Sequence, residues 1–297
     1  MILLTGATGF LGRRVLRTMA GQNWIVRPLV RDEDKYRASF PGGPGPLVGD
    51  FCNFKKGDLA EERFGEFVHL ASEVWPVDRK DISQFRRVNV DGSRAILAAL
   101  DPKVINIVVL ASTVSVYGNM RGPIHEQCAS RPNNAYAESK REQELIFLEF
   151  GARHNIPVII LRFSSIYGPG QFPGTVLPLF LDLALHDRTL TITGPPDRLQ
   201  NFIFVDDAAR AVALSIDKTA GGVFNIASKK ETTLRTLAAA ILKTTGARAH
   251  AIERSKPDAA PAESFHIETS KAERELEWSP RYDLESGLIQ TLAEMQQ

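Results

Sequence analysis

The chain has 297 residues, of which 43% are hydrophobic and 24% are charged. These values are ordinary for a globular protein, and the length is enough for one large α/β domain or two packed domains. Because 36 Lys and Arg residues balance 35 Asp and Glu residues, the charge gives no reason to expect a nucleic acid or an anionic membrane as partner.

The cysteines and the apolar segments narrow the class further. Cys52 and Cys128 lie far apart and match no metal-ligand spacing, so we expect no metal. A chain of this length with two cysteines needs no disulfide framework, and we therefore expect a reducing, cytoplasmic location. The apolar start, MILLTG, is too short for a signal peptide and lacks its basic flank, and no stretch approaches the length of a membrane span.

Short apolar runs alternate with helical patterns along the first half of the chain. We expect strands at 1–5, 24–30, 46–49, 66–71, 104–112 and 157–163, and helices near 10–20, 80–100 and 135–154. Most of the strands are nearly continuous in Val, Ile and Leu, as strands covered on both faces are. FPGGPGP, between the second and third strands, predicts a turn-rich loop rather than a full helix. The alternation predicts an α/β fold with a doubly wound parallel sheet.

The pattern changes after YGPGQFPG, residues 167–174, where Gly and Pro cluster. Shorter elements follow, with strands expected at 190–193, 202–205 and 222–227, and helices at 176–186, from about 206, at 232–245 and near the C-terminus. We therefore expect a first domain over 1–166 and a smaller α/β domain over 167–297, with some later segments returning to the first domain.

A glycine-rich loop joins the first strand to the first helix. Gly6, Gly9 and Gly12 have the spacing G-x-x-G-x-x-G rather than the commoner G-x-G-x-x-G. Small residues let the backbone approach a pyrophosphate, and a helix N-terminus offers unpaired N–H groups with positive partial charge. The loop therefore predicts a dinucleotide-binding site.

The end of the second strand bears on which dinucleotide binds. An acidic residue about 20 positions past the loop usually holds the ribose 2′-OH of NAD, whereas an Arg accommodates the 2′-phosphate of NADP. Arg31 and Asp32 both stand here. We favour Arg31 and NADP, because Arg31 is the first residue after the strand. NAD with Asp32 is the alternative, as is a solvated charge cluster.

The segment NAYAESK places Tyr136 four residues before Lys140, which on a helix puts both on one face. This spacing often arises by chance, so its meaning depends on the rest of the chain. Ten stretches resemble the extended short-chain dehydrogenase/reductases, the NAD(P)-dependent sugar-nucleotide epimerases, dehydratases and reductases. In chain order they are TGATGFLG, VGDF, VHLAS, NVDGS, ASTVSVYG, YAESK, LRFSSIYGPG, NFIFVDDAARA, VFNIAS and ELEWSPRYDLESGL.

The resemblance covers nearly the whole chain. It implies a Rossmann domain, a small C-terminal substrate domain, an active site between them, and a homodimer formed through a four-helix bundle. The implied cofactor contacts are Gly6, Gly9, Phe10, Leu11 and Gly12 at the pyrophosphate, Arg31 at the ribose phosphate, Asp50 and Phe51 at the adenine, Leu70, Ala71 and Ser72 at the diphosphate and ribose, Ser112 beside the catalytic threonine, and Phe163 and Ser164 at the nicotinamide. Asp58 is a rival match for Asp50, and Asn89 matches the residue that braces the strand beside the site.

The same resemblance assigns catalysis to Thr113, Tyr136 and Lys140. A free phenol has a pKa of about 10 and is a poor base at neutral pH. A nearby ammonium and an oxidised nicotinamide favour the phenolate, so Tyr136 would act as general acid/base. Lys140 would also bind the nicotinamide ribose, and Thr113 would hold the reacting oxygen. For Thr113 the alternative is a strand-end residue with a satisfied hydroxyl.

Other polar residues of these stretches have plainer interpretations. His69 is expected to be a packed histidine rather than a base. Helix capping is a sufficient role for Asp206 or Asp207.

Two departures from the family pattern concern the substrate. Members that act on nucleotide sugars usually carry Asn at the position of Ser165, and Arg-Asp where this chain has Gln200 and Asn201. A neutral Gln cannot replace the charge of Arg on a diphosphate, although Arg198 stands two residues away. We expect Thr113, Ser165, Arg198 and Gln200 to contact the substrate.

The preferred reaction is reduction of a keto-sugar nucleotide by NADPH, because Arg31 favours NADP. The alternatives are an NAD-dependent sugar-nucleotide epimerase, a reductase of a non-nucleotide ketone, and a non-catalytic NADP-binding sensor. Sensors of this kind commonly lose the Tyr and Lys. A dehydratase is disfavoured, because Val114 and Ser115 stand where dehydratases carry an Asp-Glu pair for elimination.

Overall fold

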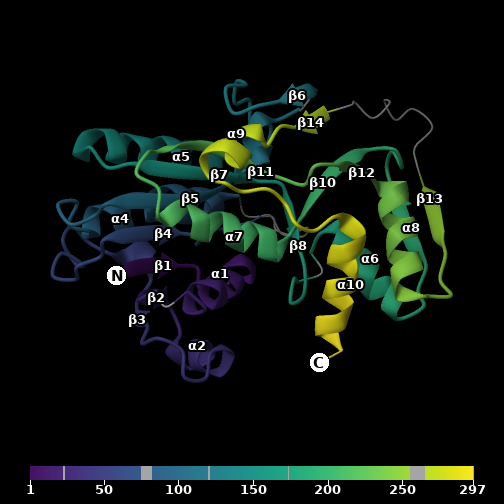
Figure 1. The fold of residues 1–297 in the computed structure, drawn as a ribbon, viewed down its shortest axis with the longest axis horizontal. Coiled ribbons are helices and arrows are strands. Elements are labelled where there is room, and N and C mark those ends of the chain that lie inside the picture. The colour runs from purple at the N-terminus through teal and green to yellow at the C-terminus, as the bar shows by residue number, and fades with distance from the viewer. Residues whose placement is uncertain (23, 75–81, 120, 173, 255–264, 297) are drawn as a thin grey trace.

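The computed structural model describes residues 1–22, 24–74, 82–119, 121–172, 174–254 and 265–296. A seven-stranded sheet forms its centre, with the strand order β11-β7-β5-β4-β1-β2-β3 (Figure 1). All neighbours in it are parallel. The strands are β1 (Ile2–Thr5), β2 (Val26–Val30), β3 (Leu47–Val48), β4 (Glu66–His69), β5 (Ile107–Thr113), β7 (Val158–Phe163) and β11 (Gly222–Ile226). The predicted α/β class and parallel Rossmann sheet are confirmed.

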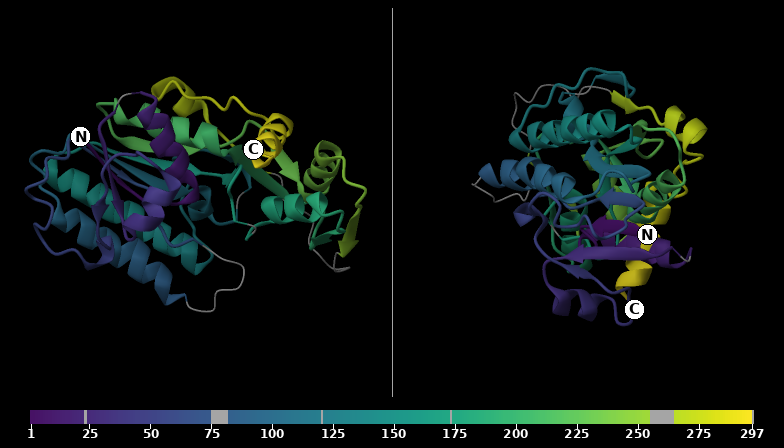
Figure 2. Two further views of the ribbon diagram at one scale, coloured as in Figure 1. Left: turned by 90° about the horizontal axis from the view of Figure 1, so that it is seen from below. Right: turned by 90° about the vertical axis from the view of Figure 1, so that its left-hand side faces the viewer.

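Helices cover both faces of this sheet (Figures 1 and 2). On one face lie α1 (Phe10–Ala20) and α7 (Val205–Ile216), which pack against each other, and on the other lie α4 (Gly92–Ala99) and α5 (Ala135–His154). Side chains alternate between the two cores, so Leu4 of β1 joins the first and Leu3 the second. Since the strands are parallel, the loops that follow them gather at one sheet edge, where such folds bind ligands.

The helical segments between the early strands differ from the prediction in two places. Of the helix predicted near 80–100, residues 80 and 81 lie outside the described residues, and the rest consists of α3 (Ser83–Phe85), the π-helix η2 (Arg86–Asp91) and α4. Between β2 and β3, α2 (Glu33–Ser39) precedes the predicted loop. Its N-cap is Asp32, whose carboxylate accepts from Lys35 N at 2.9 Å. The capping carboxylate explains a helix that the Gly-Pro cluster obscured.

A smaller group of elements packs beyond one end of the sheet (Figure 1). In it, β10 (Leu199–Phe204) lies between β8 (Ser165–Tyr167) and β12 (Glu231–Thr233), and β9 (Leu190–Thr193) pairs with β13 (Ala251–Arg254). The helices α6 (Val176–Leu185), α8 (Leu234–Thr245) and α10 (Leu284–Met295) enclose a core of their own. Because β11 and α7 lie in the larger part, segments after residue 166 contribute to both parts, and the domain boundary stays a prediction.

The remaining elements are short. They are η1 (Phe51–Asn53), η3 (Val114–Tyr117), α9 (Ser270–Glu275), and the parallel pair of β6 (Gly122–Ile124) and β14 (Phe265–Ile267). None of the helices in the described segments is both long and apolar enough to cross a membrane.

Asp207 anchors the C-terminal segment instead of capping α7. Its carboxylate is 1% exposed and accepts from the backbone N–H groups of Arg281 and Tyr282, each at 2.9 Å. Asp206 pairs with Arg14 of α1 at 3.0 Å. The N-terminus of α7 has no side-chain cap, so the capping role predicted for one of these aspartates was wrong. Both carboxylates instead make tertiary contacts: Asp207 holds the C-terminal segment to α7, and Asp206 holds α1 to α7.

Candidate active site

The loop between β1 and α1 is packed too closely for any residue but glycine at two positions. Gly6 has a φ of +74°, and a Cβ on it would lie 2.7 Å from Ala71 N. A Cβ on Gly12 would lie 1.9 Å from the carbonyl oxygen of Gly6. The helix begins after Gly9 without a side-chain cap, and its first intrahelical bond is from Arg13 N. The N–H groups of Phe10 and Leu11 therefore stay available, and this cradle fits a pyrophosphate.

The segment after β4 forms the opposite side of this cradle. Leu70 N and Ala71 N donate to the backbone and side-chain oxygens of Thr5, at 3.4 and 3.3 Å, and Ser72 follows. Phe163 ends β7, and the hydroxyl of the next residue, Ser164, is buried and has no hydrogen-bond partner among the described residues. Buried hydroxyls are rarely left unpaired, so this group also fits a ligand at the sheet edge.

The residues predicted for the adenine and its ribose follow β2 and β3, the two strands beyond β1 in the sheet. Phe51 packs edge-on against the His69 ring, with centroids 5.4 Å apart, and the Asp50 carboxylate accepts from Cys52 N at 3.0 Å. Arg31 follows β2 directly and is exposed. Because Asp32 caps α2, its carboxylate already has a structural role.

Tyr136 and Thr113 meet where α5 passes the end of β5. The helix is capped by Asn134, whose side chain accepts from Ala137 N at 2.9 Å, and this places Tyr136 in the first turn. The phenol lies near enough to Thr113 for the threonine side chain to affect its pKa. Burial raises the pKa of Tyr136 to about 12, although Thr113 opposes the rise. Without a bound cation from the cofactor, Tyr136 is therefore a proton donor rather than a base.

Lys140 lies one turn further along α5 and is 2% exposed. Its Nζ donates to Ala111 O at 2.8 Å, to Ser72 Oγ at 3.4 Å, and to Gln143 Oε1. Burial lowers the pKa of Lys140 to about 7, and the charge of Glu144 opposes this change. The predicted trio of Thr113, Tyr136 and Lys140 is thus brought together at the edge where the glycine loop lies.

Asn89 ties three segments together behind this trio. Its Oδ1 accepts from Ser72 Oγ at 2.9 Å and from Glu73 N at 2.7 Å, and its Nδ2 donates to Ser139 Oγ at 2.9 Å. Asn89 lies in the π-helix η2, a form of helix often found at functional sites. The bracing geometry expected of Asn89 is present.

The side chain of Ser112 is bound within the protein and does not face a cofactor. Its hydroxyl donates to Glu144 Oε1 at 2.6 Å, and the same carboxylate receives Arg162 Nε at 2.9 Å and Nη2 at 2.7 Å. Both charged side chains are buried. A side-chain cofactor role for Ser112 is therefore not supported. This ion pair was not predicted, although an arginine inside the apolar strand PVIILRF was a signal for it.

His69 is fully buried, and its Nδ1 lies 2.8 Å from Thr5 Oγ1. Burial lowers the pKa of His69 to about 3. Aromatic rings surround it at centroid distances of 5.4, 5.6 and 5.3 Å, from Phe51, Phe67 and Phe147. It is a packed, neutral histidine, as expected.

Of the predicted substrate residues, Thr113 ends β5 of the large sheet, Ser165 and Gln200 lie on adjacent strands of the smaller sheet, and Arg198 directly precedes β10. Ser165 begins β8 and is exposed, and Gln200 lies on the neighbouring β10. Arg198 is also exposed. In the amide orientation that satisfies both ends of Gln200, its oxygen accepts from Arg198 Nε at 3.3 Å. Asn201 is buried, and its amide exchanges two hydrogen bonds with the backbone of Ser228, at 2.8 and 2.9 Å. Of the Gln200-Asn201 pair, only Gln200 is placed to reach a ligand.

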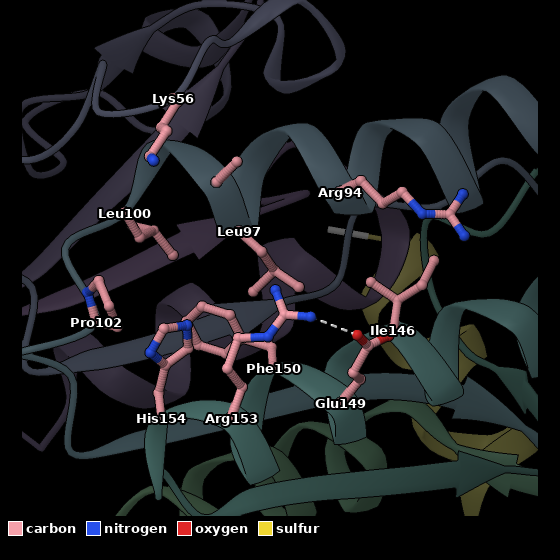
Figure 3. Close-up of a pocket in the computed structure, with 11 residues that line it drawn as sticks. Lys56, Arg94, Leu97, Leu100, Pro102, Ile146, Glu149, Phe150, Arg153 and His154 are labelled. Carbon is pink, nitrogen blue, oxygen red and sulfur yellow. Dashed lines mark hydrogen bonds and ion pairs between the residues drawn. The ribbon is translucent and has the colours of Figure 1, made fainter.

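A pocket of about 460 Å³ lies elsewhere, between α4 and α5 (Figure 3). Leu97, Ile146 and Phe150 form an apolar lining, and Arg94 and Arg153 are among its cations. It contains none of the residues predicted for cofactor, catalysis or substrate. The pocket is therefore separate from the candidate active site.

Comparison with known proteins identifies the family. Residues 2–227 match the model of the NAD dependent epimerase/dehydratase family. The chain belongs to this family and is an enzyme of the extended short-chain dehydrogenase/reductase type, as the sequence predicted.

Individual relatives agree with this membership over nearly the full length. The dTDP-glucose 4,6-dehydratase of Streptomyces griseus is 29% identical over 307 residues, which cover 98% of this chain and 93% of the relative. MoeE5, solved in complex with UDP-glucose and NAD, is 25% identical with a TM-score of 0.86 and coverage of 99% and 98%. The UDP-glucose 4-epimerase of Thermotoga maritima, at 22% identity, a TM-score of 0.87 and coverage of 99% and 98%, shows the shared fold.

Proposed function

We propose that this protein oxidises and re-reduces a hydroxyl-bearing carbon of a nucleotide sugar, as an NAD-dependent epimerase does. The observation that carries the proposal is the meeting of Thr113, Tyr136 and Lys140 at the sheet edge that also holds the glycine cradle. Names of relatives support the substrate class, because they include a dTDP-glucose dehydratase and proteins bound to UDP-glucose.

In this proposal each residue of the site has a separate chemical role. A bound nicotinamide supplies a hydride acceptor and donor. Thr113 holds the reacting oxygen, and Tyr136 takes or returns the proton at that oxygen. Lys140 is the cation that favours the phenolate over the phenol. The orphaned hydroxyl of Ser164 and the glycine cradle are the groups of this chain that would hold the cofactor.

Dehydration is disfavoured even though the curated relatives include dehydratases. At the two positions after Thr113, dehydratases carry an acid pair, whereas Val114 is buried and Ser115 has a hydroxyl, which accepts from Thr113 Oγ1 at 3.1 Å. Neither residue can donate or remove a proton during the loss of water. The proposal therefore keeps the carbon skeleton and its hydroxyl groups intact.

A second candidate is the NADPH-dependent reductase of a keto-sugar nucleotide. Arg31 favours it, because this exposed guanidinium directly follows β2 while the Asp32 carboxylate caps α2. The homodimer and the cytoplasmic location stay predictions.

Titration of cofactor-stripped protein with NADPH and NADH separates the two candidates. Tighter binding of NADPH by tenfold, about 1.4 kcal/mol, would favour the reductase. A preference for NADH, or NAD that cannot be removed, would favour the epimerase.

The activity itself is tested by incubating the protein with UDP-glucose or dTDP-glucose and following the sugar by NMR. We expect an epimer of unchanged mass and no net consumption of NAD. A product lighter by one water would make the protein a dehydratase. Protein with bound NAD that changes neither sugar would contradict the proposed substrate class.

A further inference from the structure

Gln143 is a fully buried polar side chain whose amide is used at both ends. It lies on α5 three residues after Lys140, so the two share one side of the helix. Its Nε2 donates to Ser93 Oγ at 2.8 Å, and its Oε1 accepts from Lys140 Nζ. The amide therefore connects the candidate catalytic lysine to α4.

The orientation of the Gln143 amide follows from the hydrogen bonds of Ser93. The hydroxyl of Ser93 donates to the backbone oxygen of Asn89 at 2.7 Å. A carbonyl can only accept, so the hydroxyl hydrogen of Ser93 is used there, and its oxygen is left to accept from Gln143. The amide nitrogen must then face Ser93 and the amide oxygen must face Lys140. Neighbouring groups thus orient an amide whose two ends would otherwise be hard to tell apart.

The environment of Lys140 Nζ consists of neutral acceptors. They are Ala111 O, Ser72 Oγ and Gln143 Oε1, and among the described residues no carboxylate lies within ion-pair distance of this nitrogen. A neutral amine has too few hydrogens for all three oxygens, whereas an ammonium has one for each. These hydrogen bonds therefore favour the charged form of Lys140 and act against the burial, which lowers its pKa.

We propose that Gln143 is a positioning residue for Lys140, which holds the ammonium in place and in its charged form through the hydrogen-bond chain from Asn89 and Ser93. The inference rests on the proposed function, since it gives Lys140 the role described there. Gln143 touches neither substrate nor cofactor in this role. It acts through Lys140, whose bond to Ser72, at 3.4 Å, is the longest of the three and the easiest to exchange for a ligand hydroxyl.

The other titratable groups around Lys140 do not replace Gln143. Glu144 lies on the same helix, but its carboxylate is bound by Arg162 and Arg141. His69 on β4 is neutral because burial lowers its pKa to about 3, and Tyr136 is neutral because burial raises its pKa to about 12. Gln143 is thus the side chain whose change should be felt most directly at Lys140.

The test is an NMR titration of protein carrying lysine labelled at the ε-carbon, with Lys140→Arg identifying the Lys140 signal. Gln143→Glu places a carboxylate beside the ammonium, and we expect the midpoint of the Lys140 titration to rise by more than about one pH unit, a tenfold change in its proton affinity. Gln143→Met removes the acceptor and should lower the midpoint. Opposite shifts from the two variants would not arise from a merely structural effect.

Two further variants keep the test decisive. Ser93→Ala releases the amide from its fixed orientation, and we expect a smaller downward shift even if Gln143→Met folds poorly. Gln290→Met on α10 makes the matched change at a distance, where Gln290 binds Glu294 at 3.1 Å, and should leave Lys140 unchanged. A midpoint that stays in place in Gln143→Glu and Ser93→Ala would overturn the inference. Because the titration needs neither cofactor nor substrate, its outcome is independent of whether the proposed function fails.

Discussion

The two sides of the candidate site differ in how firmly the protein fixes their side chains. Around Lys140, the polar groups are buried and joined in a continuous hydrogen-bond chain through Gln143, Ser93 and Asn89. Across the site, Ser165 and Arg198 are exposed, and among the described residues the Arg198 side chain hydrogen-bonds to Gln200 alone. The first side is organised before any ligand arrives, as catalytic groups must be. The second leaves its side chains free to adjust to a substrate.

The largest effect is expected from removing the phenol of Tyr136, which lies on the same side of the site as Lys140. Tyr136→Phe deletes the proposed proton-transfer group, and turnover should fall by about 10²–10⁴-fold. Cofactor affinity should change little, because the phenol lies beside Thr113, whereas the glycine loop forms the pyrophosphate cradle. Turnover and the binding of NADH are measured on the same preparation.

The matched control for this change is Tyr282→Phe in the C-terminal segment, where the ring packs against Phe204 with centroids 4.5 Å apart. Its turnover should stay at the wild-type level. If Tyr136→Phe also keeps that level, Tyr136 is not the acid/base and the fixed side has another purpose.

His69 should make the free energy of unfolding of the protein depend on pH. Its pKa is lowered to about 3 in the folded protein, against about 6.5 in an unfolded chain. Between these values the unfolded chain binds more protons. The free energy of unfolding should therefore fall as the pH falls below about 6.5, by up to about 1.4 kcal/mol per pH unit.

Urea unfolding of His69→Gln between neutral and mildly acidic pH checks this prediction. The variant should lose most of the slope, whereas His186→Gln, at a side chain that is 65% exposed, should keep it. Lys140 does not contribute to the slope below neutral pH. Because its pKa in the folded protein is lowered to about 7, its effect on stability changes with pH only above pH 7. An unchanged slope in His69→Gln would mean that other groups cause the acid sensitivity.

The parts of the site that could be predicted from the sequence are those fixed by local geometry. Gly12 is required by its close approach to Gly6 within one strand-turn-helix unit, and Tyr136 and Lys140 are one helical turn apart. Both signals lie within a few residues of chain. The same holds for the strands, whose apolar runs are continuous and local.

The parts that were missed depend on contacts between distant segments. Gln143 and Ser93 are 50 residues apart, and nothing in either local sequence indicates that their side chains meet. Asp207 was taken for a helix cap because its neighbours begin a helix, whereas its partners lie 74 and 75 residues further along the chain. Local chemistry shows that such a side chain needs a partner, but only the folded structure shows which one.

The smallest effect is expected on the exposed side. Arg198→Ala removes a cation that could meet a substrate diphosphate, but solvent screens its charge and the side chain loses little fixed structure. We expect KM to rise by about threefold to tenfold, near 1 kcal/mol, with kcat unchanged. Arg188→Ala, at another exposed arginine, should change neither constant.

Gln200→Arg makes the opposite change at the neighbouring strand, where family members that bind nucleotide sugars usually carry Arg. It should lower KM for UDP-glucose while the pH dependence of turnover stays that of the wild type. The two substitutions together separate binding from chemistry. If Arg198→Ala lowered kcat as strongly as Tyr136→Phe, the exposed side would take part in the chemical step, and the contrast between an organised side and an adaptable side would no longer describe the site.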